Sequence, residues 1–474
     1  MKLALLALLP LSIQAADIPR TWTASAVAAF EVPLAKPITA PVYLSEAAYY
    51  QLPERSIFKT YPVYHPSREP AGYMDWLKQQ EPQIVFNPAN LQTEADWLRA
   101  GEQIFNSPIS FGPVFFGAAE LRDPAFYEQT RMPVAADGTI PFARWVVRRK
   151  GEVELGSMGC NTCHTRVMPD GSILPGAQGN NPNDRQGAWM LRRAVKFAPP
   201  AELLKRVRTF AQQFEVPGLA NDPNRAAQSM SLEALIAAGE AIPPGVTARA
   251  HTSMLLPPQI PDIIGVRERR FLDHTGLVRQ QSIGDLMRYT TLVQDMIGPT
   301  PRVRYSDAQL YALSLYIYSL QPPPNPNQPT PLTARGQAVF QRARCGSCHT
   351  PPLYTSNKLM PVDGFTPPAA HRARFDIAST RVGTDPRYAL QSRKATGYYK
   401  VPSLKGLWYR GPLEHHGSVA TLEDWFNPAR LKEGYTPTAY KGPDGRAASV
   451  PGHEFGMKLS LADREALIAF LRTL

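Results

Sequence analysis

The sequence predicts a mainly α-helical protein that contains two similar helical units in tandem. Three observations lead to this expectation: a five-residue cysteine pattern occurs twice, a pair of amphipathic helices accompanies each copy, and a proline-rich segment separates the two sets. The 48 prolines and 32 glycines favour many ordered loops over long helices or a large sheet. With 43% hydrophobic residues among 474, the chain can bury a core, and its length suggests two or three domains.

The first residues have the composition of a secretory signal peptide. Lys2 precedes an apolar run over residues 3–11, and small and polar residues follow up to Ala16. This run is too short to cross roughly 30 Å of hydrocarbon, and no other segment approaches the roughly 18 apolar residues of a membrane span. We therefore expect removal of residues 1–16 and a mature chain that is periplasmic or secreted, without a membrane span.

The net charge of +11 comes from basic residues that are scattered along the chain. This distribution is typical of a solvated basic surface, which can attract an acidic redox protein. No nucleic-acid motif accompanies the charge, so we expect no nucleic-acid partner.

All four cysteines belong to two copies of the pattern Cys-x-x-Cys-His, in "GCNTCHTR" (159–166) and "RCGSCHTP" (344–351). A thioredoxin-like redox pair would leave both histidines unexplained. A zinc site with four cysteines would place its two pairs roughly 15–20 residues apart, whereas these copies end 185 residues apart, at His164 and His349.

Covalent attachment of c-type haem explains every residue of the pattern. Two thiols three positions apart can reach the two vinyl groups of one porphyrin, and the adjacent histidine can bind the iron from one face. The sequence therefore predicts two covalently bound haems. The attachment residues are Cys160 and Cys163 for the first and Cys345 and Cys348 for the second, with His164 and His349 as the iron ligands.

A repeated pair of helices surrounds the two cysteine patterns. "RAGEQIF" (99–105) and "ARGQAVF" (334–340) share one spacing of glycine and phenylalanine, and residues 306–320 match residues 461–474. Both later segments are amphipathic at the helical period and begin with a capping residue. In c-type cytochromes an N-terminal helix crosses a C-terminal helix beside the haem, and glycine at the crossing lets the backbones approach. We expect two such domains in tandem.

These features divide the chain. The first cytochrome c domain is predicted over residues 95–321 and the second over 333–474, joined by a proline-rich linker at 322–332 with polyproline II conformation. Residues 106–159 form a long insertion before the first haem motif, expected to fold over that haem. Residues 17–94 form a loop-rich N-terminal extension.

The sixth iron ligand decides whether a haem only transfers electrons or can also bind a small substrate. For the second haem, the segment before the last helix offers His453 as the preferred ligand and Met457 as the alternative. For the first haem, no candidate stands in a glycine-flanked loop before the closing helix, so an open or weakly ligated iron is expected. The candidates there are His251, His274, Met168, Met190, Met230, Met254, Met287 and Met296.

The segment "YYKVPSLKGLWYRGPLEHHGSVATLEDWF" (398–426) resembles a signature of the bacterial di-haem cytochrome c peroxidase superfamily. The resemblance covers mainly residues 332–474 and implies two haem domains close enough for electron transfer. The matching positions are Pro402, Ser403, Leu404, Pro412, His415, Gly417, Ser418, Thr421, Leu422 and Glu423.

The family often holds a calcium ion between its domains, partly by backbone near this segment. Here Arg410 and Glu414 depart from the peroxidase pattern. In its histidine, the segment "GHEFG" (452–456) is more similar to the di-haem rubber oxygenases than to the peroxidases. The rubber oxygenases also have a long N-terminal region. Residues 265–289 look like the inter-domain segment of that branch, and Phe271 is then expected to line the pocket of the first haem, although Leu272 follows it instead of tryptophan.

The sequence thus predicts an exported di-haem oxidoreductase of the haem peroxidase type. Electrons from a small redox protein or a dye-like donor would enter at the His349 haem and reach the His164 haem, where peroxide or O₂ is reduced or activated. Two alternatives remain: an oxygenase acting on an apolar substrate, and a non-catalytic electron-transfer cytochrome. Catalytic candidates are Phe271, His274 and, as proton donors in the insertion, Glu120 and Glu128.

Overall fold

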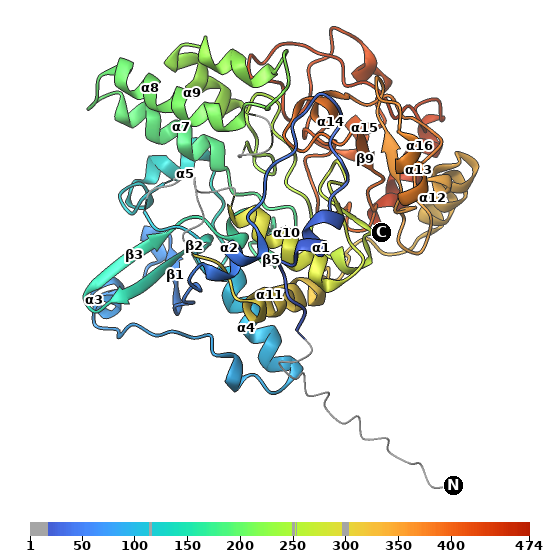
Figure 1. Cartoon of the computed structure of the whole chain (residues 1–474). Coiled ribbons are helices and arrows are strands. Elements are labelled where there is room, and N and C mark those ends of the chain that lie inside the picture. The colour runs from blue at the N-terminus through green and yellow to red at the C-terminus, as the bar shows by residue number, and fades with distance from the viewer. Residues whose placement is uncertain (1–17, 113–115, 249–251, 253, 296–302) are drawn as a thin grey trace, which may run out of the picture.

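The computed structural model describes residues 18–112, 116–248, 252, 254–295 and 303–474. The predicted signal peptide lies outside these residues. Within them, the fold is mixed and leans towards helix, with short α-helices and four small sheets of two or three strands. Figure 1 shows the helices of the C-terminal part on one side of the molecule and a three-stranded sheet on the other. The expectation of a mainly α-helical chain is corrected by this sheet.

No helix among the described residues combines the length and the hydropathy that crossing a membrane requires.

The first predicted helix pair is present. Helix α4 (Glu94–Asn106) begins with a capping box in which the Thr93 side chain accepts from the backbone N–H of Asp96. It crosses α11 (Asp307–Ser319) at Gly101, where an added Cβ would lie 2.1 Å from the carbonyl oxygen of Ala312. Glycine is required there because the two backbones touch. The crossing buries the apolar side of α4 in the largest hydrophobic core.

The second helix pair repeats this arrangement. Helix α12 (Pro331–Arg342) crosses α16 (Leu461–Arg472) at Gly336, where an added Cβ would lie 1.9 Å from the carbonyl oxygen of Ala466. The rings of Phe340 and Phe470 pack edge to face beside the crossing, with centroids 5.5 Å apart. Both crossings match the helix pairs that the sequence repeat predicts.

The predicted end of the linker is two residues too late. Helix α12 starts at Pro331, so Pro331 and Leu332 belong to its first turn rather than to a polyproline segment. Proline is favourable at the first helical position because its missing N–H would have no partner there. The side chain of Thr330 caps the helix by accepting from the N–H of Thr333.

The N-terminal extension and the insertion share one antiparallel sheet. Strand β1 (Thr60–Tyr64) from the extension pairs with β2 (Thr139–Arg149), and β2 pairs with β3 (Glu152–Gly156). Aromatic and aliphatic side chains of β2 pack against α5 (Pro124–Thr130) in a second core. The two regions therefore form one folded unit beside the first cysteine pattern. From the sequence they are predicted as two separate segments.

The extension also ties the two halves of the chain together. The backbone N–H of Val32 donates to Leu277 in the first half, at 2.7 Å, and that of Ala35 donates to Ala395 in the second, at 2.8 Å. A buried ion pair between Lys394 and Asp273 spans the same junction.

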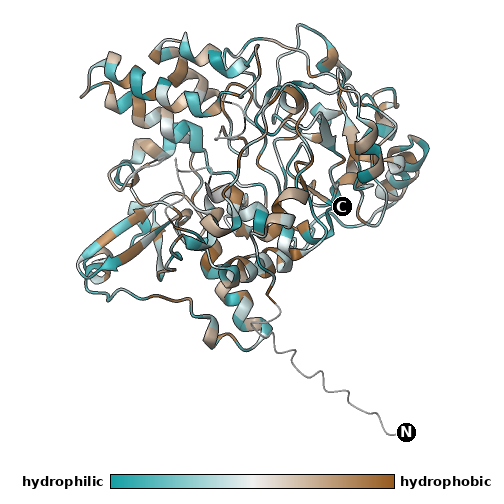
Figure 2. Ribbon diagram, in the orientation of Figure 1, coloured by the Kyte–Doolittle hydropathy of each residue, from teal (hydrophilic) through white to brown (hydrophobic). Residues whose placement is uncertain are grey.

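Figure 2 shows both hydrophobic and hydrophilic residues along the helices of the chain. The remaining elements are short. The helices are α1 (Ala24–Ala29), α2 (Glu46–Gln51), α3 (Tyr73–Lys78), α6 (Cys160–Cys163), α7 (Asn183–Ala194), α8 (Pro200–Ala211), α9 (Leu232–Ala241), α10 (Ile283–Asp295), α13 (Ala369–Arg374), α14 (Arg387–Gln391) and α15 (Leu422–Trp425). The strands are β4 (Thr165–Val167), β5 (Ile173–Pro175), β6 (Phe271–Leu272), β7 (Val278–Arg279), β8 (Leu359–Pro361) and β9 (Tyr398–Lys400).

Candidate functional site

The first cysteine pattern is held by the insertion. Its two cysteines lie at the ends of the single-turn helix α6, and two buried side chains between them bind strand β2. The Asn161 amide donates to the carbonyl of Pro141 at 2.7 Å, and the Thr162 hydroxyl donates to that of Phe142 at 3.0 Å. The insertion therefore packs directly on the predicted attachment site of the first haem.

The first thiol of each pattern is not activated for redox exchange. Burial raises the pKa of Cys160 to about 12 and that of Cys345 to about 11. Cysteines that attack disulfides have a lowered pKa instead, because the thiolate is the nucleophile. This chemistry disfavours the thioredoxin-like interpretation of the two patterns.

Both pattern histidines are held in the same orientation. The Nδ1 atom of His164 lies 3.1 Å from the carbonyl oxygen of Pro261. That of His349 lies 3.2 Å from the carbonyl oxygens of Tyr354 and of Pro402. A carbonyl oxygen only accepts, so Nδ1 must carry the proton and Nε2 keeps its lone pair. This tautomer, fixed by a backbone carbonyl, is the one that metal-binding histidines commonly use.

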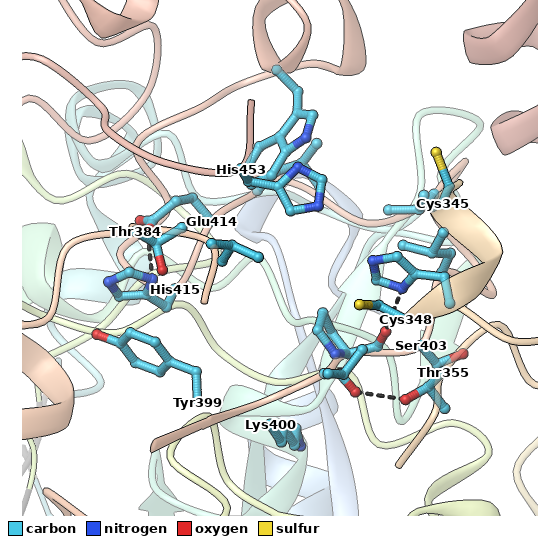
Figure 3. A pocket seen from close by; sticks show the side chains of 18 of the residues that line it. Cys345, Cys348, Thr355, Thr384, Tyr399, Lys400, Ser403, Glu414, His415 and His453 are labelled. Atoms are coloured by element: carbon cyan, nitrogen blue, oxygen red, sulfur yellow. Dashed lines mark hydrogen bonds and ion pairs between the residues drawn. The ribbon is translucent and has the colours of Figure 1, made fainter. Parts of the chain in front are cut away.

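A second imidazole faces His349 across a cavity (Figure 3). The ring centroids of His349 and His453 are 6.2 Å apart, and their planes are inclined by 53°. Metal–imidazole bonds are about 2 Å long, and each ring centre lies about 1 Å beyond its nitrogen, so two imidazoles on opposite sides of one ion have centres roughly 6 Å apart. The pair, with Cys345 and Cys348 lining the same cavity, fits a haem with two axial histidines.

A buried arginine shapes the turn that carries His453. The Arg430 guanidinium, 1% exposed, donates to the carbonyls of Val450, Gly452 and His453, the last two at 2.7 and 3.1 Å. His453 has a φ of 48°, a left-handed conformation that a non-glycine residue adopts only when its surroundings impose it. Burial lowers the pKa of His453 to about 4, so its ring is neutral at pH 7. A neutral imidazole is the form that can bind iron.

Met457 occupies a different position. Its side chain is buried, but it is not among the residues that line the cavity. Its backbone carbonyl accepts from the Arg464 guanidinium at 3.1 Å. The structure therefore brings His453, and not Met457, opposite His349.

Phe271 and His274, two further candidate residues, line this same cavity. Phe271, in β6, belongs to the wall beside the second cysteine pattern, which differs from the expectation that it lines a pocket at the first haem. The cause is the β6–β7 hairpin, which packs on residues of the second half such as Phe375. His274 is fixed in the wall by a 2.7 Å hydrogen bond from Nε2 to the carbonyl of Gln259.

The two predicted proton donors lie outside the cavity lining. Glu128 is exposed on α5, and Glu120 is half-buried and accepts from the backbone N–H of Gly117 at 2.8 Å. Among the candidate ligands of the first haem, His251 and Met296 lie outside the described residues. The others pack in hydrophobic clusters: Met168, Met190, Met230, Met254 and Met287.

The carbonyl oxygens near Pro412 do not form a calcium site. The Gln178 amide donates to the carbonyls of Gly245 and Pro412, both at 3.1 Å, and the Gln259 amide donates to Pro412 at 2.6 Å. The Arg166 guanidinium donates to the carbonyl of Gly411 at 3.2 Å. Side-chain donors thus use the oxygens that a calcium ion would need. In the described part of the chain, no three His, Cys, Asp or Glu side chains could hold a metal ion.

No protein family and no curated protein matches this sequence. Among solved structures, hydrazine synthase from Kuenenia stuttgartiensis, pressurized with xenon, has 18% identity and a TM-score of 0.31, covering 50% of this chain and 79% of that chain. A MauG-like protein associated with microbial copper homeostasis has 19% identity and a TM-score of 0.29, covering 46% and 73%. TM-scores of this size do not establish a shared fold.

Proposed function

We propose that this chain is an exported oxidoreductase with two covalently bound c-type haems that reduces or activates peroxide. The observation that carries this proposal is the placement of His349 and His453, whose rings face each other at 6.2 Å beside Cys345 and Cys348. When bound, haem would supply an iron that carries electrons where both axial positions are filled and that reacts with peroxide where one is open.

The two sites would have different roles. At the second site, His349 and His453 would fill both axial positions, so this site would take electrons from a small redox protein or a dye-like donor. The first site, with His164 on one side, is then the place for peroxide. Its pattern is covered by β2 of the insertion, through Asn161 and Thr162.

Several residues would support the second site without touching iron. Arg430 holds the carbonyls of the turn and thereby the position of the His453 ring. The ring centroids of Trp425 and Phe455 lie 5.2 and 5.6 Å from that of His453, so both aromatic rings pack beside it. The carbonyls that accept from Nδ1 of His349 hold the opposite ring.

Three measurements on the exported protein test the function. We expect the reduced protein to bind carbon monoxide at one haem and to oxidise a reduced small cytochrome or dye when hydrogen peroxide is added. Oxygen uptake with an isoprenoid, without peroxide turnover, would instead indicate an oxygenase. A protein that neither binds carbon monoxide nor turns over peroxide would be a non-catalytic electron-transfer cytochrome, and the proposal would be wrong.

A further inference from the structure

The cavity at the second cysteine pattern has more buried positive than negative charge in its wall. Arg269, Lys400 and Arg410 all line it, together with the carboxylate of Asp262. A second lining carboxylate, Glu414, contacts the Nδ1 atom of His415. Charges buried without a counter-charge are costly, so a wall of this kind indicates an anionic group in the cavity.

The two arginines are anchored by backbone carbonyls. Arg269 donates to the carbonyls of Asp262 and Ile264, the second at 2.7 Å. Arg410 donates to the carbonyl of Ser403 at 2.8 Å, and its Nε lies 3.7 Å from the Asp262 carboxylate. Both guanidinium groups are therefore held in place before any ligand binds.

Lys400 is a lining cation that no carboxylate contacts directly among the described residues. In the described part of the chain its ammonium group forms neither a hydrogen bond nor an ion pair. The nearby Asp273 carboxylate is already paired with Lys394 and accepts from the hydroxyl of Tyr289 at 2.8 Å. Burial, followed by the Arg269 guanidinium, lowers the pKa of Lys400 to about 7. An anion beside it would restore its charge.

The position of Lys400 indicates which anion this is. A c-type haem carries its two propionates on the porphyrin edge away from the vinyl groups that bind cysteine. Figure 3 shows Lys400 apart from Cys345, in another part of the cavity lining. Counted at full charge, the four lining cations Arg269, Arg344, Lys400 and Arg410 exceed the lining carboxylates Asp262 and Glu414 by two, which equals the charge of two propionates.

On the basis of the proposed function, we propose that Arg269, Lys400 and Arg410 bind the propionate groups of the haem attached to Cys345 and Cys348. The arginines supply fixed hydrogen-bond donors, and Lys400 supplies a further cation. These residues thereby set the reduction potential of the electron-carrying site, since a cation beside a haem favours its reduced form.

The test compares Lys400→Met with Lys405→Met in the haem-loaded protein. Lys405 is a matched control because its side chain is 51% exposed and lies 3.7 Å from Glu268 at the surface. We expect K400M to lower the reduction potential of the low-spin haem and to shift the propionate bending band in the resonance Raman spectrum. K405M should leave both unchanged, and Lys400→Arg should restore both.

A second variant covers the case in which K400M does not accumulate. Arg410→Gln also removes one of the three cations and is expected to change the potential and the Raman band in the same direction. If neither K400M nor R410Q differs from K405M while two haems are attached, the propionate assignment is overturned and the proposed function stands. If the wild-type protein carries no haem, the proposed function fails and the assignment fails with it.

Discussion

Replacing Gly336 by alanine tests the close helix crossing that positions the second cysteine pattern. The added Cβ would lie 1.9 Å from the carbonyl oxygen of Ala466 and 2.7 Å from Cβ of Phe470, whereas ordinary contacts begin at 3.4 Å. The nearer atom, the carbonyl oxygen of Ala466, belongs to the backbone and cannot rotate away. Helices α12 and α16 must therefore separate, and α12 leads within three residues to Cys345.

The expected loss of stability can be estimated from two opposing effects. Overpacking of this kind costs about 1–3 kcal/mol, and the backbone obstacle at Ala466 places Gly336→Ala near the upper value. Alanine gains about 1 kcal/mol in helix propensity over glycine. The net expectation is a destabilisation of about 2 kcal/mol. Gly101→Ala, at the first crossing, should behave in the same way.

Gly187 provides the matched control. It lies inside helix α7, and no atom is within 4 Å of an added Cβ. Gly187→Ala should therefore keep only the propensity gain and stabilise the protein by up to about 1 kcal/mol. Guanidinium denaturation followed by far-ultraviolet circular dichroism measures all three variants. If Gly336→Ala were as stable as Gly187→Ala, the close crossing would be refuted.

Further predictions concern the ligand, a buried ion pair, pH and metal removal. His453→Ala should convert the low-spin second haem to a high-spin form that binds carbon monoxide, whereas Met457→Ala should keep the low-spin spectrum; the reverse result would exchange their roles. Lys394→Met removes the ammonium group that pairs with the buried Asp273 carboxylate and should cost about 3–5 kcal/mol in denaturant unfolding, and a neutral result would contradict the buried pair. Burial lowers the pKa of His416 to about 4, below its ordinary 6.5. Between these two pH values the imidazole is protonated in the unfolded chain but not in the folded one, so the free energy of unfolding falls as the pH drops from 6.5 towards 4. This loss is about 3 kcal/mol, and His416→Phe should reduce the pH dependence seen in denaturant titrations by about this amount. Treatment with a calcium chelator should leave the melting temperature unchanged, and a decrease would indicate a bound ion.

The helix pairs were predictable because their signals are local and repeated. Gly101 and Gly336 share a spacing with the following phenylalanine, and each belongs to a helix whose capping residues stand in the sequence. The preference for His453 over Met457 at the cavity also came from a local feature, the glycine-flanked loop before the last helix. The structure places this histidine opposite His349, and its role as a ligand stays a prediction.

Other parts of the site depend on contacts between distant segments. Arg430 lies 23 residues before His453 in the sequence and binds the carbonyl of that residue. No spacing in the sequence indicates that an arginine makes this hydrogen bond. The cations Arg269 and Lys400 meet in one cavity wall although they belong to different halves of the chain. The pairing of β1 with β2 likewise joins the extension to the insertion, which sequence periodicity alone does not reveal.

The most direct test of the central claim is the intact mass of the mature protein, purified after export from a cell that attaches c-type haem. Two covalently bound haems predict a mass that exceeds the processed polypeptide by two haem groups, together with a coloured protein. A colourless protein with the mass of the polypeptide alone would contradict covalent attachment at both cysteine patterns. A mass with one haem would contradict the division of roles between the His164 and His349 sites.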